Sequence, residues 1–235
     1  MRAEVDHLVI AARSLDEGVQ WCEATLGVVP GPGGAHPLMG THNRLLALDG
    51  TAPFSPFSRC YLEIIAIEPG RHPERATGQH RWFDLDDPAL QAGLAQHGPR
   101  LVHFVARVPD AQAAVRALAH EPTHLDRGQV IAASRDTPAG RLEWQITVRD
   151  DGQRLFYGAM PTLIQWGPVH PLDSMPPSGL RLTGLSAAHP RIEVLREALH
   201  CIGLRDGIAL RQGAPHLGAT LDTPRGTVTL DSKGL

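Results

Sequence analysis

The sequence has little of the features that would assign it to a specialised class of protein. Cysteine occurs only at Cys22, Cys60 and Cys201, which lie far apart within apolar runs. This is typical of buried reduced thiols and excludes a disulfide framework or a CxxC zinc site. No run of 18 apolar residues is present, so the sequence predicts no transmembrane helix. Its start lacks the apolar centre of a signal peptide, and we therefore expect a cytoplasmic protein.

An excess of charge of one sign is also lacking. The chain has 22 basic and 25 acidic residues, giving a net charge of -3, and Lys233 is its one lysine. Without a basic excess, neither nucleic acid nor an anionic membrane is an expected partner. There is no P-loop, GxGxxG or GxSxG motif, which excludes the common signatures of nucleotide binding and serine hydrolysis. The expected partner is a small molecule.

A repeated order of elements is what the sequence does contain. Residues 5–12 form an apolar, β-branched run that predicts a strand. Ser14 follows as a helix N-cap with Glu17 three residues later, apolar residues then recur at helical spacing, and Gly27 stands where a C-cap glycine is expected. Strand candidates come next at residues 35–40, 43–48 and 61–67.

The same order returns twice. A strand is predicted at residues 101–108 and a helix from Pro109, followed by strands at 129–134, 141–148 and 160–166. Another strand is predicted at residues 180–187 and a helix from Pro190, followed by strands at 208–212, 217–222 and 226–230. We expect one domain over residues 1–168, built of modules 1–98 and 99–168, and a third module over residues 169–235.

Three β-α-β-β-β units place the chain in the α+β class. We predict repeated βαβββ modules, two of them paired into a cupped mixed β-sheet, with the third at the C-terminus. A generic α+β domain with chance periodicity is the alternative. The last strand of the third module has no carboxylate, so no metal ligands are expected there. An unpaired module leaves a sheet edge or face to be covered by the barrel or by another subunit, and we predict a homodimer.

Strand parity predicts which side chains share the face opposite the helices. With the large aliphatic residues of each first strand against the helix, His7 and His103 point to the other face, where Glu63 and Gln165 join them. Two imidazoles and a carboxylate on one concave face favour a divalent ion such as Zn, Fe, Mn, Ni or Co. A carboxylate inside an apolar strand is costly unless it is paired or metal-bound. Separate local hydrogen bonds for each side chain are the alternative.

Other residues are candidates for the same site. Glu143 takes the place of the glutamine if the strand count is off by one. Asn43 and Arg44, in the GTHNR segment, are candidates to bind a substrate carboxylate or carbonyl, because arginine offers paired donors. Holding a turn is the alternative for the asparagine. Most remaining histidines stand beside Pro, Gly or charged residues and are expected at the surface or in loops, among them His36 and His170.

Several motifs resemble a known superfamily. VDHLVIAARSLDEGVQWCEATLG and YLEIIAI are similar to the vicinal oxygen chelate superfamily, which includes glyoxalase I, extradiol dioxygenases and fosfomycin or bleomycin resistance proteins. HPLMGTHNRLLAL and PTLIQWGPVHP resemble its bacterial glyoxalase-like domain family, over roughly residues 4–170. The resemblance implies a metal site whose ligand positions fall on His7, Glu63, His103 and Gln165.

The sequence departs from two patterns within that superfamily. Glyoxalase I has a glutamate, thought to move a proton, at the position of Gln165, and an amide cannot act as a base. The dioxygenases use two histidines and one glutamate, but the carboxylate here, Glu63, lies in the first unit instead of the second. The resemblance implies a metal-dependent lyase, isomerase or dioxygenase whose small substrate chelates a divalent metal through two oxygens. The alternative is a non-catalytic protein that sequesters a small molecule or antibiotic.

Overall fold

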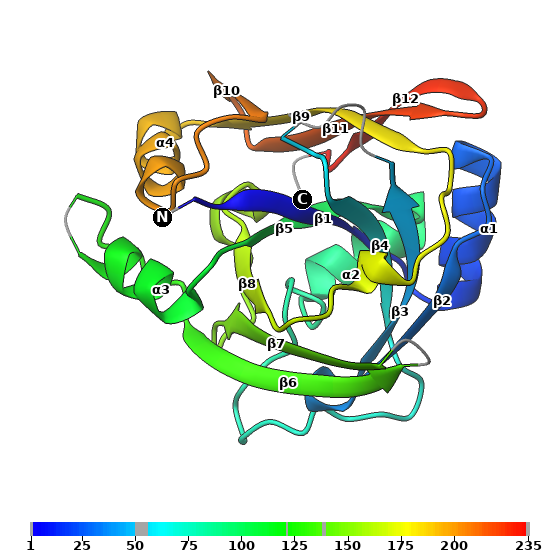
Figure 1. Cartoon of the computed structure of the whole chain (residues 1–235), viewed down its shortest axis with the longest axis horizontal. Helices are drawn as coiled ribbons and strands as arrows, with labels where there is room; N and C mark the ends of the chain where they lie inside the picture. Colours follow the sequence, from blue (N-terminus) through cyan, green and yellow to red (C-terminus); the bar gives the residue numbers. More distant parts are fainter. Residues whose placement is uncertain (1, 50–55, 121, 138–139, 234–235) are drawn as a thin grey trace.

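A computed structural model describes residues 2–49, 56–120, 122–137 and 140–233. Two sheets build the molecule (Figure 1). The larger is an eight-stranded mixed sheet in the order β2-β3-β4-β1-β5-β8-β7-β6, and it curls into a cup. The smaller has four strands in the order β10-β9-β11-β12 and lies across the outside of the cup, along the top of Figure 1.

The first module has the predicted order. It comprises β1 (Glu4–Ala11), α1 (Leu15–Leu26), β2 (Gly31–His36), β3 (Thr41–Leu48) and β4 (Cys60–Ile67). The Ser14 side chain accepts a hydrogen bond from the backbone N–H of Glu17, and Gly27 ends α1 with a φ of 76°. Both predicted caps of this helix are thus confirmed, and a left-handed C-cap explains the glycine.

The second module follows the same plan. It comprises β5 (Arg100–Arg107), α3 (Ala111–Ala119), β6 (Gln129–Thr137), β7 (Gly140–Val148) and β8 (Thr162–Trp166). In each module the first strand pairs in parallel with the last, β1 with β4 and β5 with β8. The antiparallel pair β1–β5 joins the modules into one sheet. The predicted fold of paired βαβββ modules is therefore confirmed.

The third module keeps the order of elements but not the pairing. It comprises β9 (Arg181–His189), α4 (Ile192–Cys201), β10 (Ile208–Gln212), β11 (His216–Thr223) and β12 (Gly226–Asp231). Here β9 pairs in parallel with β10, the strand that directly follows α4, and antiparallel with β11. Its first strand therefore lies inside the sheet, between second and third strands of the module, whereas β1 pairs with the last strand of its own module.

The core between the two sheets belongs to both of them. It contains Leu8 and Ile10 of β1, Leu185 of β9 and Leu195 of α4, all buried, and the apolar faces of α1 and α3. The outside of the cup is thus covered by this chain's own third module. The sequence left a sheet edge or face to be covered by the barrel or by another subunit, and the chain itself covers it. The homodimer stays a prediction.

The concave face of the cup has a second core, which the sequence did not predict. Between β4 and β5, the chain forms α2 (Pro88–His97), with Asp87 as its N-cap. Leu90 and Leu94 of this helix, with Trp82 and Phe83 before it, pack against the strands inside the cup. Much of the concavity is therefore filled by the chain itself.

The segment before α2 is held in an uncommon conformation. Phe83 and Asp84 have φ of 61° and 56°, in the left-handed region that non-glycine residues rarely occupy. The Asp84 carboxylate accepts from Arg154 Nε at 2.9 Å, and its backbone N–H donates to the carbonyl of Gly152 at 3.0 Å. These contacts fix the two aromatic side chains over the inside of the sheet.

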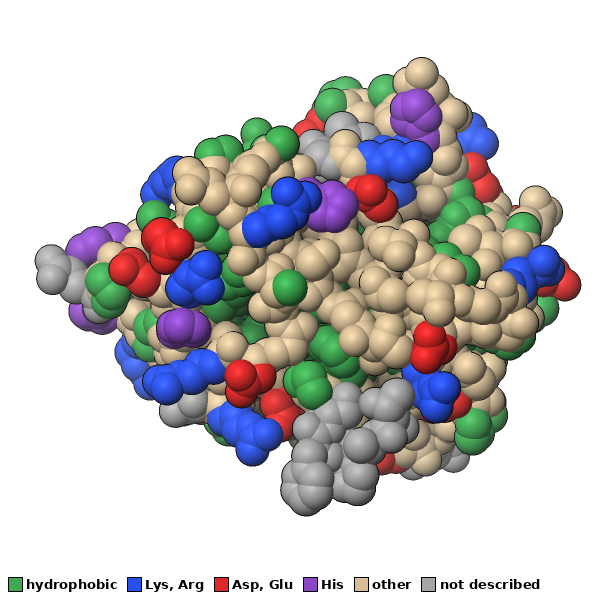
Figure 2. Space-filling view, turned by 90° about the horizontal axis from the view of Figure 1, so that it is seen from above, with side chains coloured by type: hydrophobic (Ala, Val, Ile, Leu, Met, Phe, Trp, Pro, Cys, Tyr) green, Lys and Arg blue, Asp and Glu red, His purple; other side chains and the backbone are tan. Residues whose placement is uncertain are grey.

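Short 3-10 helices at Pro37–Met39, Leu155–Gly158 and Pro171–Asp173 complete the described elements. None of the helices in the described ranges is long and apolar enough to cross a membrane. On the side of the molecule seen in Figure 2, basic and acidic side chains are interspersed. That distribution agrees with the balanced charge of the sequence.

Candidate functional site

A β-bulge in β1 brings two ionisable neighbours into the interior. Val5 pairs with Ala106 of β5, but His7 pairs with Val105, so Asp6 is an extra residue in the ladder. Asp6 and His7 are only 0% and 4% exposed. Bulges re-aim side chains in this way and are common beside active sites.

Asp6 accepts hydrogen bonds from three side chains. His7 Nδ1 lies 2.7 Å from Oδ1, and His170 Nε2 and Trp166 Nε1 each lie 3.1 Å from Oδ2. Burial alone would raise the pKa of this carboxyl, but the hydrogen bonds from His170 and His7 outweigh it and hold the pKa of Asp6 below its ordinary value. Asp6 is therefore a carboxylate at neutral pH, and His7 Nδ1 carries the proton that it donates to Asp6.

His7 directs its other nitrogen at a second carboxylate. Its Nε2 lies 3.7 Å from Oε2 of Glu63, and both side chains are less than a tenth exposed. The ring stacks on Tyr61 with centroids 4.4 Å apart and planes 20° apart, which fixes its orientation. In the neutral ring, the lone pair of Nε2 faces the carboxylate. This pair can accept, hold and return a proton.

Glu63 is itself held by the predicted substrate-binding residue Asn43. Asn43 Nδ2 donates to Glu63 Oε1 at 2.6 Å, and Asn43 Oδ1 accepts from the backbone N–H of Gly34 at 2.8 Å. A Cβ on Gly33 would lie 2.1 Å from Asn43 Oδ1, so a glycine is needed there. Asn43 joins the predicted site, but its amide is engaged in positioning Glu63.

His36 completes this side of the site, although its sequence context predicted a surface or loop residue. Its Nε2 lies 3.3 Å from Asn43 Nδ2, and its Nδ1 lies 3.1 Å from Thr41 Oγ1. Burial and the nearby charge of Arg135 lower the pKa of His36 to about 3. His36 is therefore neutral, with Nε2 accepting from the amide and Nδ1 donating to the hydroxyl.

His103 is buried as predicted, but both of its ring nitrogens are engaged. Nδ1 lies 3.0 Å from the carbonyl oxygen of Gly158, and Nε2 accepts from the backbone N–H of Thr162 at 3.0 Å. Burial, together with the charges of Arg127 and Arg154, lowers the pKa of His103 well below its ordinary value. The ring is therefore neutral and ties β5 to β8, which is the local hydrogen-bonding alternative for this residue.

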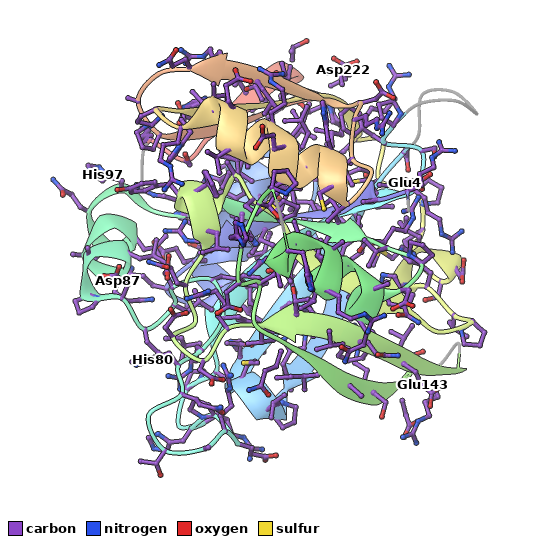
Figure 3. All side chains as sticks on the ribbon, turned by 90° about the vertical axis from the view of Figure 1, so that its left-hand side faces the viewer. Glu4, His80, Asp87, His97, Glu143 and Asp222 are labelled. Carbon is purple, nitrogen blue, oxygen red and sulfur yellow. The ribbon has the colours of Figure 1, made fainter. Side chains whose placement is uncertain are left out.

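Gln165 and Glu143 lie on the outer face of the sheet, so the predicted convergence with Glu63 is wrong for both. Gln165 Oε1 accepts from the backbone N–H of Ala111 at the start of α3. Glu143 is 58% exposed and pairs with Arg141 at 3.4 Å, and Figure 3 shows it at the outside of the β6–β7 ribbon. By the register of β5 with β8, the position that corresponds to Glu63 of β4 is Thr162, whose Oγ1 lies 3.0 Å from His103 Nε2.

Arg44 is also on the other face. It pairs across β3–β4 with Ile64, which packs in the core between the sheets, whereas its neighbour Asn43 pairs with Ile65 on the concave side. The predicted substrate contact from Arg44 therefore does not form at this site.

The predicted metal ligands do not assemble into a coordination set. His7 Nε2 and Glu63 Oε2 lie 3.7 Å apart, but the nitrogens of His103 are both hydrogen-bonded to the backbone. No group of three or more His, Cys, Asp or Glu side chains within the described residues is arranged to hold a metal ion. Three or four protein ligands are usual for transition metals. These residues therefore do not fit the metal centre, or the two-histidine, one-glutamate set, that the sequence implies.

A small cavity adjoins His7 and Glu63. Its volume is about 40 Å³, which is room for a water molecule or two. Aromatic and aliphatic side chains form much of its wall, and Trp82 contributes a buried Nε1–H that has no hydrogen-bond partner. The polar side chains around it are His7, His36, Asn43, Tyr61, Glu63 and Arg135.

Sequence reasoning missed several of these residues. Asp6 had a usable signal, since a carboxylate near the start of an apolar strand requires partners when buried. His170, whose neighbours suggested a loop, is indeed in a connecting segment, but that segment reaches back to β1. Arg135 had no signal, because its contribution depends on how β6 folds over the cup.

Comparison with known proteins identifies the family. The model of the glyoxalase-like domain matches residues 5–203, most of the chain. The chain belongs to the glyoxalase-like domain family. The superfamily resemblance in its motifs is thereby confirmed, and the match runs past residue 168 through α4 of the third module. No curated protein is detectably similar to it.

Solved structures add the fold. A hypothetical protein from Staphylococcus aureus has a TM-score of 0.58 at 14% identity, covering 91% of this chain and 87% of its own. Methylmalonyl-CoA epimerase from Mycobacterium tuberculosis matches with a TM-score of 0.36 at 19% identity, covering 73% and 91% of the two chains. A Streptomyces coelicolor methylmalonyl-CoA epimerase in complex with 2-nitronate-propionyl-CoA matches with 0.43 at 19%, covering 72% and 99%. At these two TM-scores, the likeness supports no statement about activity.

Proposed function

We propose that this member of the glyoxalase-like family is an enzyme that moves a proton on a small, oxygen-bearing substrate, as a lyase or isomerase does. The observation that carries the proposal is the pair formed by His7 Nε2 and Glu63 Oε2, 3.7 Å apart in a buried cavity. Paired titratable groups in a water-poor cavity are a common setting for acid–base catalysis.

Each group in the pair has a defined part. A C–H bond next to a carbonyl breaks, its proton passes to Glu63 or His7, and the electron pair delocalises onto the carbonyl oxygen. The Nε1–H of Trp82, which has no hydrogen-bond partner, is one donor available in the cavity for that oxygen. Asp6 stabilises the imidazolium whenever His7 holds the proton, and the proton then returns to carbon.

The test is hydrogen exchange in D2O. Small 2-oxo acids, ketones and thioesters are first screened for binding, and loss of the acidic C–H signal of those that bind is then followed by proton NMR. Glu63→Gln and His7→Gln are expected to slow exchange at least a hundredfold. Glu143→Gln, on the outer face, is the matched control and is expected to exchange at the wild-type rate.

Two outcomes contradict this proposal. If ligands bind but the wild type exchanges none of them faster than Glu63→Gln does, the chain is a sequestering protein, the alternative favoured by the aromatic lining of the cavity. If the purified protein holds about one divalent metal per chain, lost in both His7→Gln and Glu63→Gln, the metal-dependent form predicted from the sequence replaces metal-independent proton transfer.

A further inference from the structure

A large hollow lies at the seam of the cup. The eight-stranded sheet ends in β2 on one side and β6 on the other, and these edges approach each other at the lower right of Figure 1. A groove of about 770 Å³ lies between them, a size usual for small-molecule sites. Segment 171–178, which links the second and third modules, forms its remaining wall.

The lining of this groove is mainly apolar. Most of its residues are aliphatic, proline or glycine, including Val28, Val29, Leu46, Met175 and Pro176. Val29 is 57% exposed, one of the two large hydrophobic side chains that are exposed in the described chain. An exposed apolar hollow of this kind favours an apolar occupant.

The groove leads to the catalytic cavity. Leu45, Arg135, Leu142 and Pro171 line both hollows, so they form the neck between them. A ligand lying in the groove therefore reaches towards His7 and Glu63 past these four side chains.

Arg135 is the one cation at this neck, and nothing in the described chain pairs with it. Its Nη1 is buried without a hydrogen-bond partner. The guanidinium lies over Gly34, where a Cβ would come within 2.2 Å of Nη1. Asp136, which also lines the groove, is exposed, and no ion pair joins it to Arg135 among the described residues. A buried guanidinium donor without an acceptor is costly unless a ligand supplies one.

We infer that the groove and Arg135 together bind an amphipathic monoanion, an organic acid whose carboxylate pairs with Arg135 and whose apolar body lies in the groove. Arginine binds a carboxylate through two parallel hydrogen bonds, which also orients it. The inference rests on the proposed function, since it makes such an acid the substrate that presents its reactive carbon to His7 and Glu63.

The test compares two fluorescent probes that share one ring system. The anionic probe is 8-anilinonaphthalene-1-sulfonate, and its neutral partner is N-phenyl-1-naphthylamine. The wild type is expected to bind both, the anion more tightly. Arg135→Gln is expected to weaken binding of the anion at least tenfold and to change binding of the neutral probe less than twofold. Arg135→Lys keeps the charge and is expected to fall between.

Three further variants separate the contribution of the groove from that of exposed charge and from that of the proton-transfer pair. Val29→Glu, at an exposed wall position, is expected to weaken both probes. Arg141→Gln removes an exposed arginine on the outer face and is the matched control, with no change for either probe. Glu63→Gln is expected to leave both affinities unchanged while it abolishes hydrogen exchange, so a failure of the proposed function is distinguishable from a failure of this inference.

Two results overturn the inference. Equal binding of the anionic probe by the wild type and by Arg135→Gln, with both folded by circular dichroism, removes the role of Arg135. Unchanged binding of both probes by Val29→Glu removes the groove as their site. In either case hydrogen exchange by the wild type would still stand on its own measurement.

Discussion

At the scale of single residues, the site depends on a buried carboxylate, Asp6, that does not itself line the cavity. Asp6 gathers the N–H groups of His7, His170 and Trp166 around two oxygens. Removing its charge leaves buried donors with a poorer acceptor and leaves the His7 tautomer unfixed. Orientation and tautomer of a functional imidazole commonly depend on such a partner.

Asp6→Asn is therefore expected to lower the free energy of unfolding by about 1–3 kcal/mol and to reduce hydrogen exchange. Urea denaturation and the D2O assay measure the two effects. Asp222→Asn is the control, because that carboxylate is 42% exposed in a surface ion pair and is expected to change stability by less than about 1 kcal/mol. Equal stability of the two variants would contradict the role given to Asp6.

The lowered pKa of His103 predicts how the free energy of unfolding depends on pH. Its pKa lies well below 6.5 in the folded chain and near 6.5 when the chain unfolds. Below pH 6.5 the unfolded chain therefore binds a proton that the folded chain does not, so the free energy of unfolding falls with acidification, by about 1.4 kcal/mol per pH unit for such a group. His36, with a folded pKa of about 3, acts in the same direction.

Urea denaturation at pH 7, 6 and 5 tests this dependence. His103→Gln is expected to be less stable at pH 7 and to lose stability less steeply below pH 6.5 than the wild type. His97→Gln, at an exposed position on α2, is the control and is expected to keep the wild-type slope. An unchanged slope in His103→Gln would show that folding does not lower the pKa of His103.

At the scale of elements, the order of helices and strands along the chain was predictable, and the inside of the cup was not. The caps of α1 and the strands of both modules follow from periodicity and turn residues. Helix α2 could not be predicted in this way, because its apolar residues pack inside the cup against strands distant in sequence. The glycine-rich strand β2 (Gly31–His36) was expected at residues 35–40, since GPGG has little strand propensity and is extended here by pairing with β3.

The faces of β7 and β8 show why parity alone misplaced part of the site. Alternation divides a strand into two sets of residues but does not say which set is inside. In β7 the apolar set, such as Ile146, lines the cup, and Glu143 faces outwards. In β4 the apolar set, such as Leu62, faces the other core, and Glu63 lines the cup. Only the covering elements decide between the two arrangements.

The role of α2 as filling for the cup predicts a large effect of truncating its side chains. Leu94 is 0% exposed in the concave core, so Leu94→Ala is expected to cost about 2–5 kcal/mol of unfolding free energy. Val29→Ala, at an exposed position, is the control and is expected to cost less than about 0.5 kcal/mol. Urea denaturation measures both, and similar values would mean that α2 is not packed inside the cup.

At the scale of the whole molecule, the two sheets share one core and are expected to unfold together. All four tryptophans, Trp21, Trp82, Trp144 and Trp166, precede the third module. Their fluorescence therefore reports on the first two modules, whereas far-ultraviolet circular dichroism reports on the whole chain. Coincident transitions by both probes indicate a single cooperative unit.

Leu195→Ala, in the third module, tests whether that module unfolds together with the first two. Leu195 lies on α4 of the third module and is 0% exposed in the shared core, so its truncation is expected to cost about 2–5 kcal/mol. The tryptophan transition is expected to shift to lower urea together with the dichroism transition. A tryptophan transition that stays in place while the other shifts would show that the third module unfolds on its own.

The bulge in β1 also bears on how members of this fold diverge. Asp6 is an inserted position in the ladder with β5, so a chain lacking that one residue would pair without this bulge and keep its aliphatic side chains on the same core. It would still present an imidazole to the cup, but with no carboxylate behind it. Loss of a single codon, without any substitution, is therefore enough to remove the carboxylate that fixes the tautomer of His7. Two proteins that differ only in this way would still align at the histidine.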